Sequence, residues 1–272
     1  MVLYQSHVSL AHLIGRTKMK YLKELKLLQE TVPSLFKLTE LQQKEVSYKE
    51  RNEIVTSSDL FIETELIKVI KNSFPNDHFH SEEFNKFTDL QDRTWIIDPI
   101  DGTSNYVHHL DLFVNQIAFY DKGEVVLSYI YVPRASKVFH AIKGEGAYLN
   151  GKRIYTANSN HPNMLMSLVG ISHKTEKDKS LFYDMLDFAY QNSIKIRMLG
   201  TLGYEMTAVA EGSFIVLYTD VTNFWDIAPG LLLVREAGGI VLNQEGRAYV
   251  MGDHHMFCFC DEQIKDKIIK IL

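Results

Sequence analysis

The stretch from Trp95 to Asn105, Trp-Ile-Ile-Asp-Pro-Ile-Asp-Gly-Thr-Ser-Asn, constrains the fold and chemistry of this chain most strongly. Its bulky first residues predict a buried strand that stops at Asp98, because Pro99 has a fixed backbone angle and no N–H to donate. Burying Asp98 and Asp101 is costly unless cations neutralise them. The turn at Pro99 lets both carboxylates and the carbonyl of Ile100 converge, and such hard oxygen ligands suit Mg²⁺ or Mn²⁺ better than zinc.

Gly102 and Thr103 follow directly and are predicted to begin a helix. The free amide groups at a helix N-terminus favour a phosphate, as does the helix dipole. Two other interpretations are open. An Asp-rich turn can simply cap a helix, and aspartyl-phosphate phosphatases also place two aspartates after a strand. Those enzymes have one residue between the aspartates, whereas two separate Asp98 from Asp101. This spacing favours metal chelation over a nucleophile and acid pair.

The sequence Asp-Pro-Ile-Asp-Gly-Thr resembles the signature of the inositol monophosphatase family, within the superfamily that includes fructose-1,6-bisphosphatase. Gly-Glu-Gly-Ala-Tyr-Leu-Asn-Gly at 144–151 is a second similarity. The resemblance implies an α+β protein with the layered αβαβα sugar-phosphatase fold, which has a large, mainly antiparallel sheet and a second, smaller α/β half. We expect residues 1–156 to form an N-terminal α+β half with most metal ligands. Residues 157–272 would carry the last metal aspartate and the substrate-pocket residues.

The spacing of apolar residues predicts where the helices and strands lie. Alternation predicts antiparallel strands at 112–120, 125–132 and 137–142. Helical spacing predicts a helix from Lys18 that Pro33 kinks or divides, with a second segment at 35–45. Further helices are expected at 60–72, 179–190, 203–210 and 226–236, and further strands at 165–171, 195–199 and 214–218.

The resemblance also implies a set of metal ligands. Ser81-Glu82-Glu83 stands where the family has Gly-Glu-Glu, and Asp226, after Trp225, stands where it has a final metal aspartate. One Mg²⁺ would be held by Glu82, Asp98 and the carbonyl of Ile100, and a second by Asp98, Asp101 and Asp226. Two or three Mg²⁺ ions are implied, with Mn²⁺ as an alternative. From the residues alone, Asp226 is a plausible helix N-cap.

The family resemblance assigns catalytic roles to Glu82, Thr103 and Asp59. Thr103 would be hydrogen-bonded to Asp59, and this pair would orient the attacking water together with Glu82. Asp59 is also predicted to be a helix N-cap. The amides of Gly102 and Thr103 would hold the phosphate. The family carries a lysine in the preceding loop, and here Lys49 lies one residue from that place.

Substrate contacts are implied by two further stretches. Gly200 and Thr201 match a family Gly-Thr-Ala, but Leu202 replaces the alanine and would narrow the pocket. Thr219 occupies the position of a family acidic residue, and Asp220 is a possible substitute. An inositol monophosphate is the default substrate. Fructose 1,6-bisphosphate, histidinol phosphate and a nucleotide 3′,5′-bisphosphate are alternatives, and a metal-binding regulatory protein without turnover is a hypothesis of a different class.

Composition bounds the partners and the compartment. The 272 residues carry a net charge of −5, which argues against a nucleic-acid partner and leaves a small phosphorylated metabolite. No stretch reaches about 18 apolar residues, so no membrane partner is expected. Cys258 and Cys260 fit small core residues in a reducing, cytoplasmic setting. Residues 1–17 are left unassigned, and the resemblance implies a homodimer.

Overall fold

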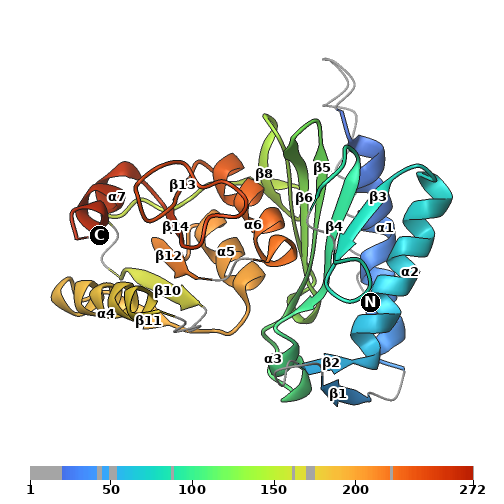
Figure 1. The fold of residues 1–272 in the computed structure, drawn as a ribbon, viewed down its shortest axis with the longest axis horizontal. Helices are drawn as coiled ribbons and strands as arrows, with labels where there is room; N and C mark the ends of the chain where they lie inside the picture. The colour runs from blue at the N-terminus through green and yellow to red at the C-terminus, as the bar shows by residue number, and fades with distance from the viewer. Residues whose placement is uncertain are drawn as a thin grey trace, which may run out of the picture.

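The computed structural model describes residues 20–41, 45–48, 54–86, 89–160, 163–169, 175–220 and 223–271. The predictions for residues 1–17 and for Lys49 lie outside these ranges. The elements stack as helices, sheet, helices, sheet, helices (Figure 1). This order confirms the predicted α+β class and the layered αβαβα fold.

The larger sheet has seven strands in the order β3-β4-β5-β6-β7-β8-β9. β3 and β4 run parallel, and every other neighbouring pair is antiparallel. The strands are β3 (His78–Ser81), β4 (Thr94–Asp101), β5 (Val114–Asp121), β6 (Glu124–Val132), β7 (Lys137–Ile142), β8 (Gly146–Leu149) and β9 (Lys152–Ile154). The alternation at 112–142 therefore predicted the centre of this sheet correctly.

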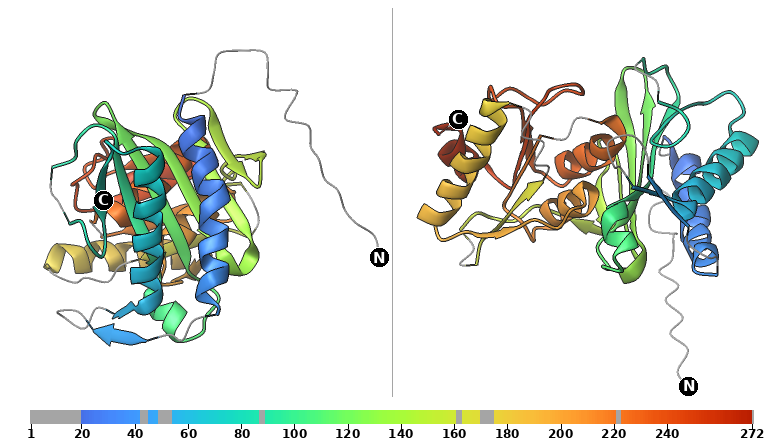
Figure 2. Two further views of the ribbon diagram at one scale, coloured as in Figure 1. Left: turned by 90° about the vertical axis from the view of Figure 1, so that its right-hand side faces the viewer. Right: turned by 60° about the horizontal axis from the view of Figure 1, so that its bottom comes forward.

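Two long helices, α1 (Leu22–Thr39) and α2 (Ser57–Ser73), cover the outer face of the larger sheet (Figure 2). Their apolar faces pack with that of the sheet in one core cluster. Pro33 lies inside α1 without dividing it, so the predicted separate segment at 35–45 was wrong. The buried side chains of Val32 and Phe36 flank the proline, and their packing holds the helix together where a backbone hydrogen bond is missing. A short hairpin, β1 (Val46–Tyr48) and β2 (Ile54–Thr56), precedes α2.

The smaller sheet has five strands in the order β11-β10-β12-β14-β13. They are β10 (Leu165–Val169), β11 (Lys195–Arg197), β12 (Val216–Thr219), β13 (Ile240–Leu242) and β14 (Met256–Phe259). Helices α5 (Leu202–Ala210) and α6 (Phe224–Glu236) lie between the two sheets, while α4 (Glu176–Gln191) and α7 (Glu262–Ile269) cover the outer face (Figure 1). Cys258 and Cys260 are buried free thiols, as predicted.

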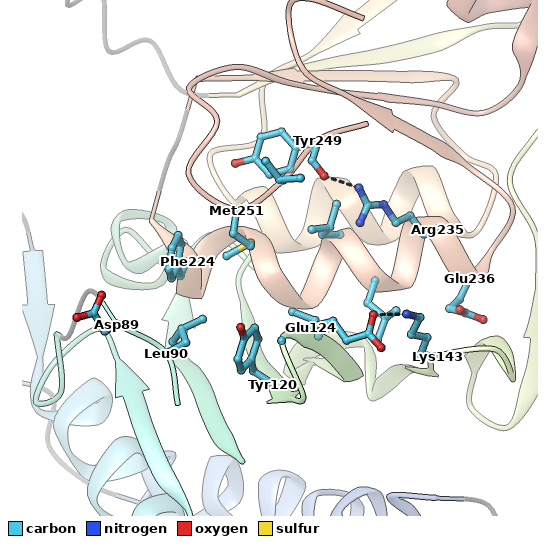
Figure 3. Close-up of a pocket in the computed structure, with 15 residues that line it drawn as sticks. Asp89, Leu90, Tyr120, Glu124, Lys143, Phe224, Arg235, Glu236, Tyr249 and Met251 are labelled. Carbon is cyan, nitrogen blue, oxygen red and sulfur yellow. Dashed lines mark hydrogen bonds and ion pairs between the residues drawn. The ribbon is translucent and has the colours of Figure 1, made fainter. Parts of the chain in front are cut away.

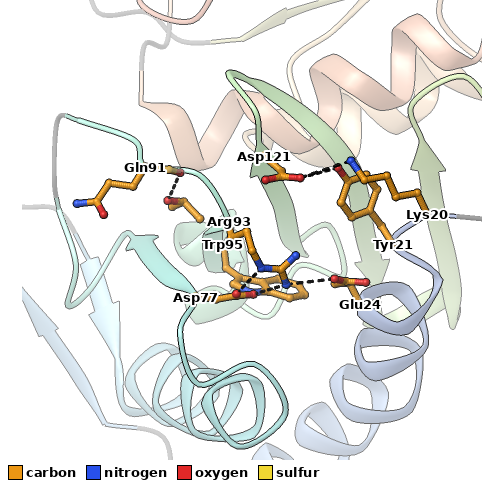
Figure 4. Close-up of polar contacts among 9 residues, drawn as sticks. Lys20, Tyr21, Glu24, Asp77, Gln91, Arg93, Trp95 and Asp121 are labelled. Carbon is orange, nitrogen blue, oxygen red and sulfur yellow. Dashed lines mark hydrogen bonds and ion pairs between the residues drawn. The ribbon is translucent and has the colours of Figure 1, made fainter.

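A polar network joins α1 to the larger sheet (Figure 4). Arg93 donates to Asp77 at 2.6 Å and to Glu24 at 3.2 Å. The indole N–H of Trp95 donates to the other oxygen of Asp77 at 2.9 Å. Both carboxylates are buried and both are matched by donors, so this network is a structural tie and the chemistry lies in another cluster.

Candidate active site

The backbone of β4 bulges at the predicted metal site. Its register with β5 shifts between Asp98 and Asp101, so Pro99 and Ile100 lie outside the regular ladder. The prediction that the strand stops at Asp98 was wrong because pairing resumes at Asp101. The reason for the break is nevertheless the missing N–H of Pro99. The side-chain amide of Asn115 bonds to the bulge, donating to the carbonyls of Asp98 and Pro99 at 3.1 Å each.

Asp98, Asp101 and Asp226 each place one carboxylate oxygen within 4.8 Å of the others. Asp98 is 1% exposed, and its Oδ1 has no hydrogen-bond partner among the described residues. Its Oδ2 accepts from the amide of Gln116 at 3.3 Å.

Burial and like charge act together on this cluster. Desolvation raises the pKa of Asp98 well above its usual range, and the charges of Glu82, Asp101 and Asp226 raise it further. Burial raises the pKa of Asp101 to about 6, and burial followed by the charge of Asp101 raises the pKa of Asp226. Carboxylates that are unfavourable when ionised, one of them with an orphaned buried oxygen, fit a bound divalent cation.

The smaller half supplies the partners that orient Asp101 and Asp226. Oδ2 of Asp101 accepts from the hydroxyl of Thr201 at 2.8 Å and from the amide of Gly203 at 2.6 Å, both at the start of α5. Oδ2 of Asp226 accepts from the amide of Asn223 at 2.9 Å. The cluster is therefore assembled from both halves of the chain.

Helix α6 begins two residues earlier than predicted. It starts at Phe224 with Asn223 as its N-cap, so Asp226 is the third helical residue and not the N-cap. Pro229 lies in the second turn, where its missing N–H leaves one carbonyl without an intrahelical partner. The hydroxyl of Ser128 on β6 donates to the carbonyl of Pro229 at 2.6 Å, which fixes this part of α6 against the larger sheet.

Glu82 lies in the loop directly after β3. Its charge raises the pKa of both Asp98 and Asp226, so it lies near them, but it is not among the carboxylates whose oxygens lie within 4.8 Å of one another. The buried carboxylate of Glu63 on α2 holds this loop, since it accepts from the hydroxyl of Ser81 and from the amides of Glu83 and Phe84 at 2.9 Å each. The backbone around Glu82 is thus fixed by hydrogen bonds to Glu63 of α2.

Thr103 and Asp59 have different partners from those predicted. Thr103 donates its hydroxyl to the carbonyl of Ile100 at 2.9 Å. Oδ2 of Asp59 accepts from the backbone N–H and hydroxyl of Thr56 at 2.8 and 2.5 Å. The N-cap of α2 is Thr56, and Asp59 closes a capping box from the third helical position.

The predicted Asp59–Thr103 hydrogen bond is therefore absent from the described contacts. The second oxygen of Asp59, Oδ1, is buried and has no hydrogen-bond partner among the described residues. Burial raises the pKa of Asp59 to about 6. The carboxylate thus keeps an acceptor that the capping box does not use.

Gly102 is required at the turn after Asp101. Its φ is +89°, and a Cβ there would lie 3.0 Å from Cβ of Thr201 and 3.2 Å from the carbonyl oxygen of Leu112. The helix that follows, α3 (Thr103–Val107), has only five residues. Its dipole is correspondingly small, so any phosphate held here would depend mainly on the first amide groups.

The Gly200–Leu202 segment lies beside this turn. The amide of Asn105 donates to the carbonyls of Leu112 and Leu199 at 2.7 Å each, which ties the two loops together. Gly200 is exposed and adopts φ +74°. Leu202 is 3% exposed and packs in the core between the sheets, so the core accommodates most of its added bulk and the expected narrowing of the pocket is small.

Asp220 faces a different part of the smaller sheet. In β12, Leu217 belongs to the core between the sheets and Tyr218 to the core under α4 and α7. Asp220 directly follows the last strand residue, Thr219, and continuing the alternation of the strand by one residue puts it on the outer side with Tyr218. The charge of Asp220 acts there on Tyr218 and His255. Its predicted place in the substrate pocket does not fit this orientation, whereas Thr219 faces inward.

A cavity of about 620 Å³ lies between α6 and the β5–β6 hairpin (Figure 3). Tyr120, Phe224, Arg235 and Met251 are among its lining residues, and an ion pair between Lys143 and Glu124 lies at one end. None of the four predicted metal-binding carboxylates lines it. The convergence of Asp98, Asp101 and Asp226, and not the volume of this cavity, therefore identifies the candidate active site.

Four positioning residues were not predicted: Asn115, Gln116, Glu63 and Glu205. The first two are an amide pair inside the otherwise apolar strand β5, which was a usable signal. Glu205 is fully buried on α5, accepts from the amide of Leu199, and has its pKa raised to about 8 by burial. A single glutamate in a helix is ordinarily solvated, so the sequence offered no comparable signal for Glu63 or Glu205.

The model of the inositol monophosphatase family matches residues 20–272. An inositol monophosphatase from Dictyostelium discoideum is 30% identical over 249 residues, which cover 90% of this chain and 91% of the relative. A fructose-1,6-bisphosphatase/inositol-1-monophosphatase from Thermotoga maritima is 32% identical, with 85% of each chain covered. The structure of the extragenic suppressor protein suhB from Bartonella henselae is 26% identical, has a TM-score of 0.80 and aligns over 91% of this chain and 96% of that one. These matches agree with the fold and the carboxylate cluster, and the chain belongs to the inositol monophosphatase family, whose members are phosphoric monoester hydrolases.

Proposed function

We propose that this protein is a Mg²⁺-dependent phosphatase that hydrolyses a small phosphate monoester, with an inositol monophosphate as the first candidate. The single observation that supports this most strongly is the convergence of Asp98, Asp101 and Asp226, with Oδ1 of Asp98 buried and unpartnered among the described residues. Family membership supplies the reaction class.

The oxygen donors fit magnesium. Glu82, Asp98, Asp101, Asp226 and the carbonyl of Ile100 would hold two or three ions, and Mn²⁺ offers a similar fit. A solved IMPase/NADP phosphatase of the same fold, 24% identical with a TM-score of 0.74, is complexed with Mg²⁺ and phosphate. When bound, Mg²⁺ supplies a Lewis acid that lowers the pKa of a coordinated water.

The residues of the chain would orient the water and the phosphate. Glu82 precedes Asp98 in the sequence and Thr103 follows it, and both side chains are half-buried. We assign them to the attacking water. Asp59 would support Thr103 through the oxygen that the capping box leaves without a described partner, once the Thr103 hydroxyl turns away from the carbonyl of Ile100. The amides of Gly102 and Thr103 would hold the phosphate, and Gly200 and Thr201 would border the substrate. We leave Asp220 out of this set because it faces the outer side of the smaller sheet.

The candidate substrates come from the family, and the proposed partners come from the net charge of the chain. The relatives include proteins named for inositol 1-phosphate and for fructose 1,6-bisphosphate, and histidinol phosphate and nucleotide 3′,5′-bisphosphates are further candidates. A net charge of −5 favours a small metabolite over a nucleic acid. No helix in the described part of the chain is long and apolar enough to cross a membrane. A homodimer is proposed on the resemblance, and a reducing, cytoplasmic setting on the free thiols of Cys258 and Cys260.

The test is phosphate release from the four candidate substrates, assayed side by side with purified protein and Mg²⁺. Turnover of at least one substrate is expected, and D98N should abolish it. D111N is the matched control, because Asp111 is an exposed aspartate paired with Arg134. If the protein releases phosphate from none of the four substrates, the metal-binding regulatory alternative is favoured. If D98N turns over like the wild type, the site assignment is wrong.

A further inference from the structure

A second cluster of metal-ligand side chains lies on the outer side of the smaller sheet. Asp178 is in the first turn of α4, and His254 and His255 immediately precede β14. Nε2 of His254 lies 3.1 Å from Oδ1 of Asp178, and Nε2 of His255 lies 3.2 Å from the same oxygen. One donor atom of each residue is thus within 4.8 Å of the others. None of these residues belongs to the proposed active site.

The two nitrogen–oxygen distances are close to the distance between two ligands of one tetrahedral zinc ion. Zinc bonds to histidine nitrogen and carboxylate oxygen are about 2.0–2.1 Å long, and ligands at tetrahedral angles are then about 3.3 Å apart. Distances of 3.1 and 3.2 Å need little adjustment to receive an ion. The ligand types also select the metal, since imidazole suits zinc and its neighbours better than magnesium.

His255 offers a buried donor atom that is available for a metal. Its side chain is fully buried, yet Nε2 makes no hydrogen bond of acceptable geometry with any described residue. Nδ1 lies 3.1 Å from the hydroxyl of Tyr218. When Nδ1 donates to that oxygen, Nε2 carries a lone pair that no described residue occupies, and a hydrogen-bond partner on the other ring nitrogen is common among zinc-binding histidines.

The other carboxylate oxygen of Asp178, Oδ2, is held by Thr175. The backbone N–H of Thr175 donates to Oδ2 at 2.9 Å, and Asp178 returns a backbone hydrogen bond to the hydroxyl of Thr175 at 3.1 Å. This capping box uses Oδ2 and leaves Oδ1 directed at the histidines. His254 is 40% exposed, so a fourth ligand position is open to water. Asp220 adds negative charge nearby, because it acts on His255.

We propose that Asp178, His254 and His255 form a binding site for a zinc-type transition-metal ion, separate from the carboxylate cluster. The ion would link the start of α4 to the segment before β14 and so stabilise the smaller half. A plain hydrogen-bonded triad explains the contacts less well, because Asp178 Oδ1 lies within reach of both rings while Nε2 of His255 makes no hydrogen bond with a described residue.

Cobalt provides a direct test, because Co²⁺ in a tetrahedral site with nitrogen ligands absorbs visible light far more strongly than Co²⁺ in an octahedral oxygen site. The full chain is stripped of metals and titrated with Co²⁺ in saturating Mg²⁺. One equivalent should produce strong visible bands, and Zn²⁺ should remove them. H254A and D178N should weaken binding by more than about 100-fold, since even residues that support ligands cost about 10–100-fold.

Two control variants locate the signal. H108A removes an exposed histidine that is likewise next to a second histidine, and D98N disables the carboxylate cluster, so both should keep the cobalt bands. Zn²⁺ should raise the melting temperature of the wild type by several degrees and that of H254A not at all. The proposal is overturned if the wild type gives no strong bands, if H254A binds like the wild type, or if D98N loses the signal.

Discussion

The hydroxyl of Ser81, at the end of β3, donates to the carboxylate of Glu63, which is fully buried on α2. The same carboxylate also accepts from the backbone amides of Glu83 and Phe84. Glu82, a proposed metal ligand, lies between these anchored residues. Glu63 therefore fixes the backbone on both sides of a proposed metal ligand without being a ligand itself.

E63Q should weaken Mg²⁺ binding while leaving the fold intact. The side chain of glutamine has only one acceptor oxygen. Its NH₂ group would face a donor that now bonds to the carboxylate of Glu63, so the loop around Glu82 should loosen. Supporting residues of this kind cost about 10–100-fold in metal affinity. The Mg²⁺ concentration for half-maximal turnover should rise by that factor. E65Q, which changes a surface glutamate of the same helix paired with Lys68, should leave it unchanged, and an equal rise in both variants would refute this role for Glu63.

D98N should separate metal binding from stability. Burial and neighbouring charges raise the pKa of Asp98, so its ionised form is unfavourable at neutral pH and the metal-free variant should melt higher than metal-free wild type. Mg²⁺ at about 100 times its Kd should stabilise the wild type by about 2.7 kcal/mol, or about 5–10 °C for a chain of this size. D98N should show almost no Mg²⁺-dependent shift in thermal unfolding, and a shift equal to that of wild type would contradict the site.

T103A should lower turnover without removing the metal. Thr103 is assigned to the attacking water, and losing a group that positions a proton transfer costs about 10²–10⁴-fold in rate. kcat should fall by that order while the Mg²⁺-dependent shift in melting temperature persists. S104A, at the exposed neighbouring position, is the control. Loss of the Mg²⁺ shift in T103A would instead make Thr103 part of the metal site.

The sequence was informative where the chemical type of a residue and the local secondary-structure pattern indicated the same role. Asp98 and Asp101 were found because paired carboxylates at a buried strand end need a cation. The N-cap of α2 was misassigned because Thr56, Ser57, Ser58 and Asp59 are all good N-cap residues, and only the packing of the helix decides among them. Similarly, nothing local shows that Asp220 turns outward, since that depends on which face of β12 meets the α4 layer.

Glu205 should make stability depend on pH in a predictable direction. Burial raises its pKa to about 8 in the folded state from the ordinary 4.5, so between these values the folded state binds more protons than the unfolded state. Stability therefore falls as pH rises through this window, by up to about 1.4 kcal/mol per pH unit. Burial also raises the pKa values of Asp59, Asp98, Asp101 and Asp226, so the contribution of Glu205 is the difference between wild type and E205Q over the range from pH 6.5 to 8.

Chemical denaturation in EDTA measures this effect. Wild type should lose about 2 kcal/mol between pH 6.5 and pH 8, and E205Q should lose much less because the amide does not titrate. E145Q, at an exposed turn position, should follow the wild type. Parallel pH profiles for wild type and E205Q would show that Glu205 ionises normally in the folded protein.

G102A should damage the active site through both strain and contact, and Gly123 allows the two to be separated. Both glycines have a positive φ, +89° at Gly102 and +85° at Gly123, so alanine costs about 1 kcal/mol or more at either position. At Gly123 a new Cβ meets nothing within 4 Å, whereas at Gly102 it meets Thr201 at 3.0 Å and the carbonyl of Leu112 at 3.2 Å. Thr201 in turn holds Asp101.

G123A should therefore lose a little stability and keep its turnover, while G102A should lose most of its turnover and bind Mg²⁺ more weakly. Equal turnover in the two variants, measured at saturating Mg²⁺, would mean that the turn at Gly102 does not position Asp101 or the substrate phosphate.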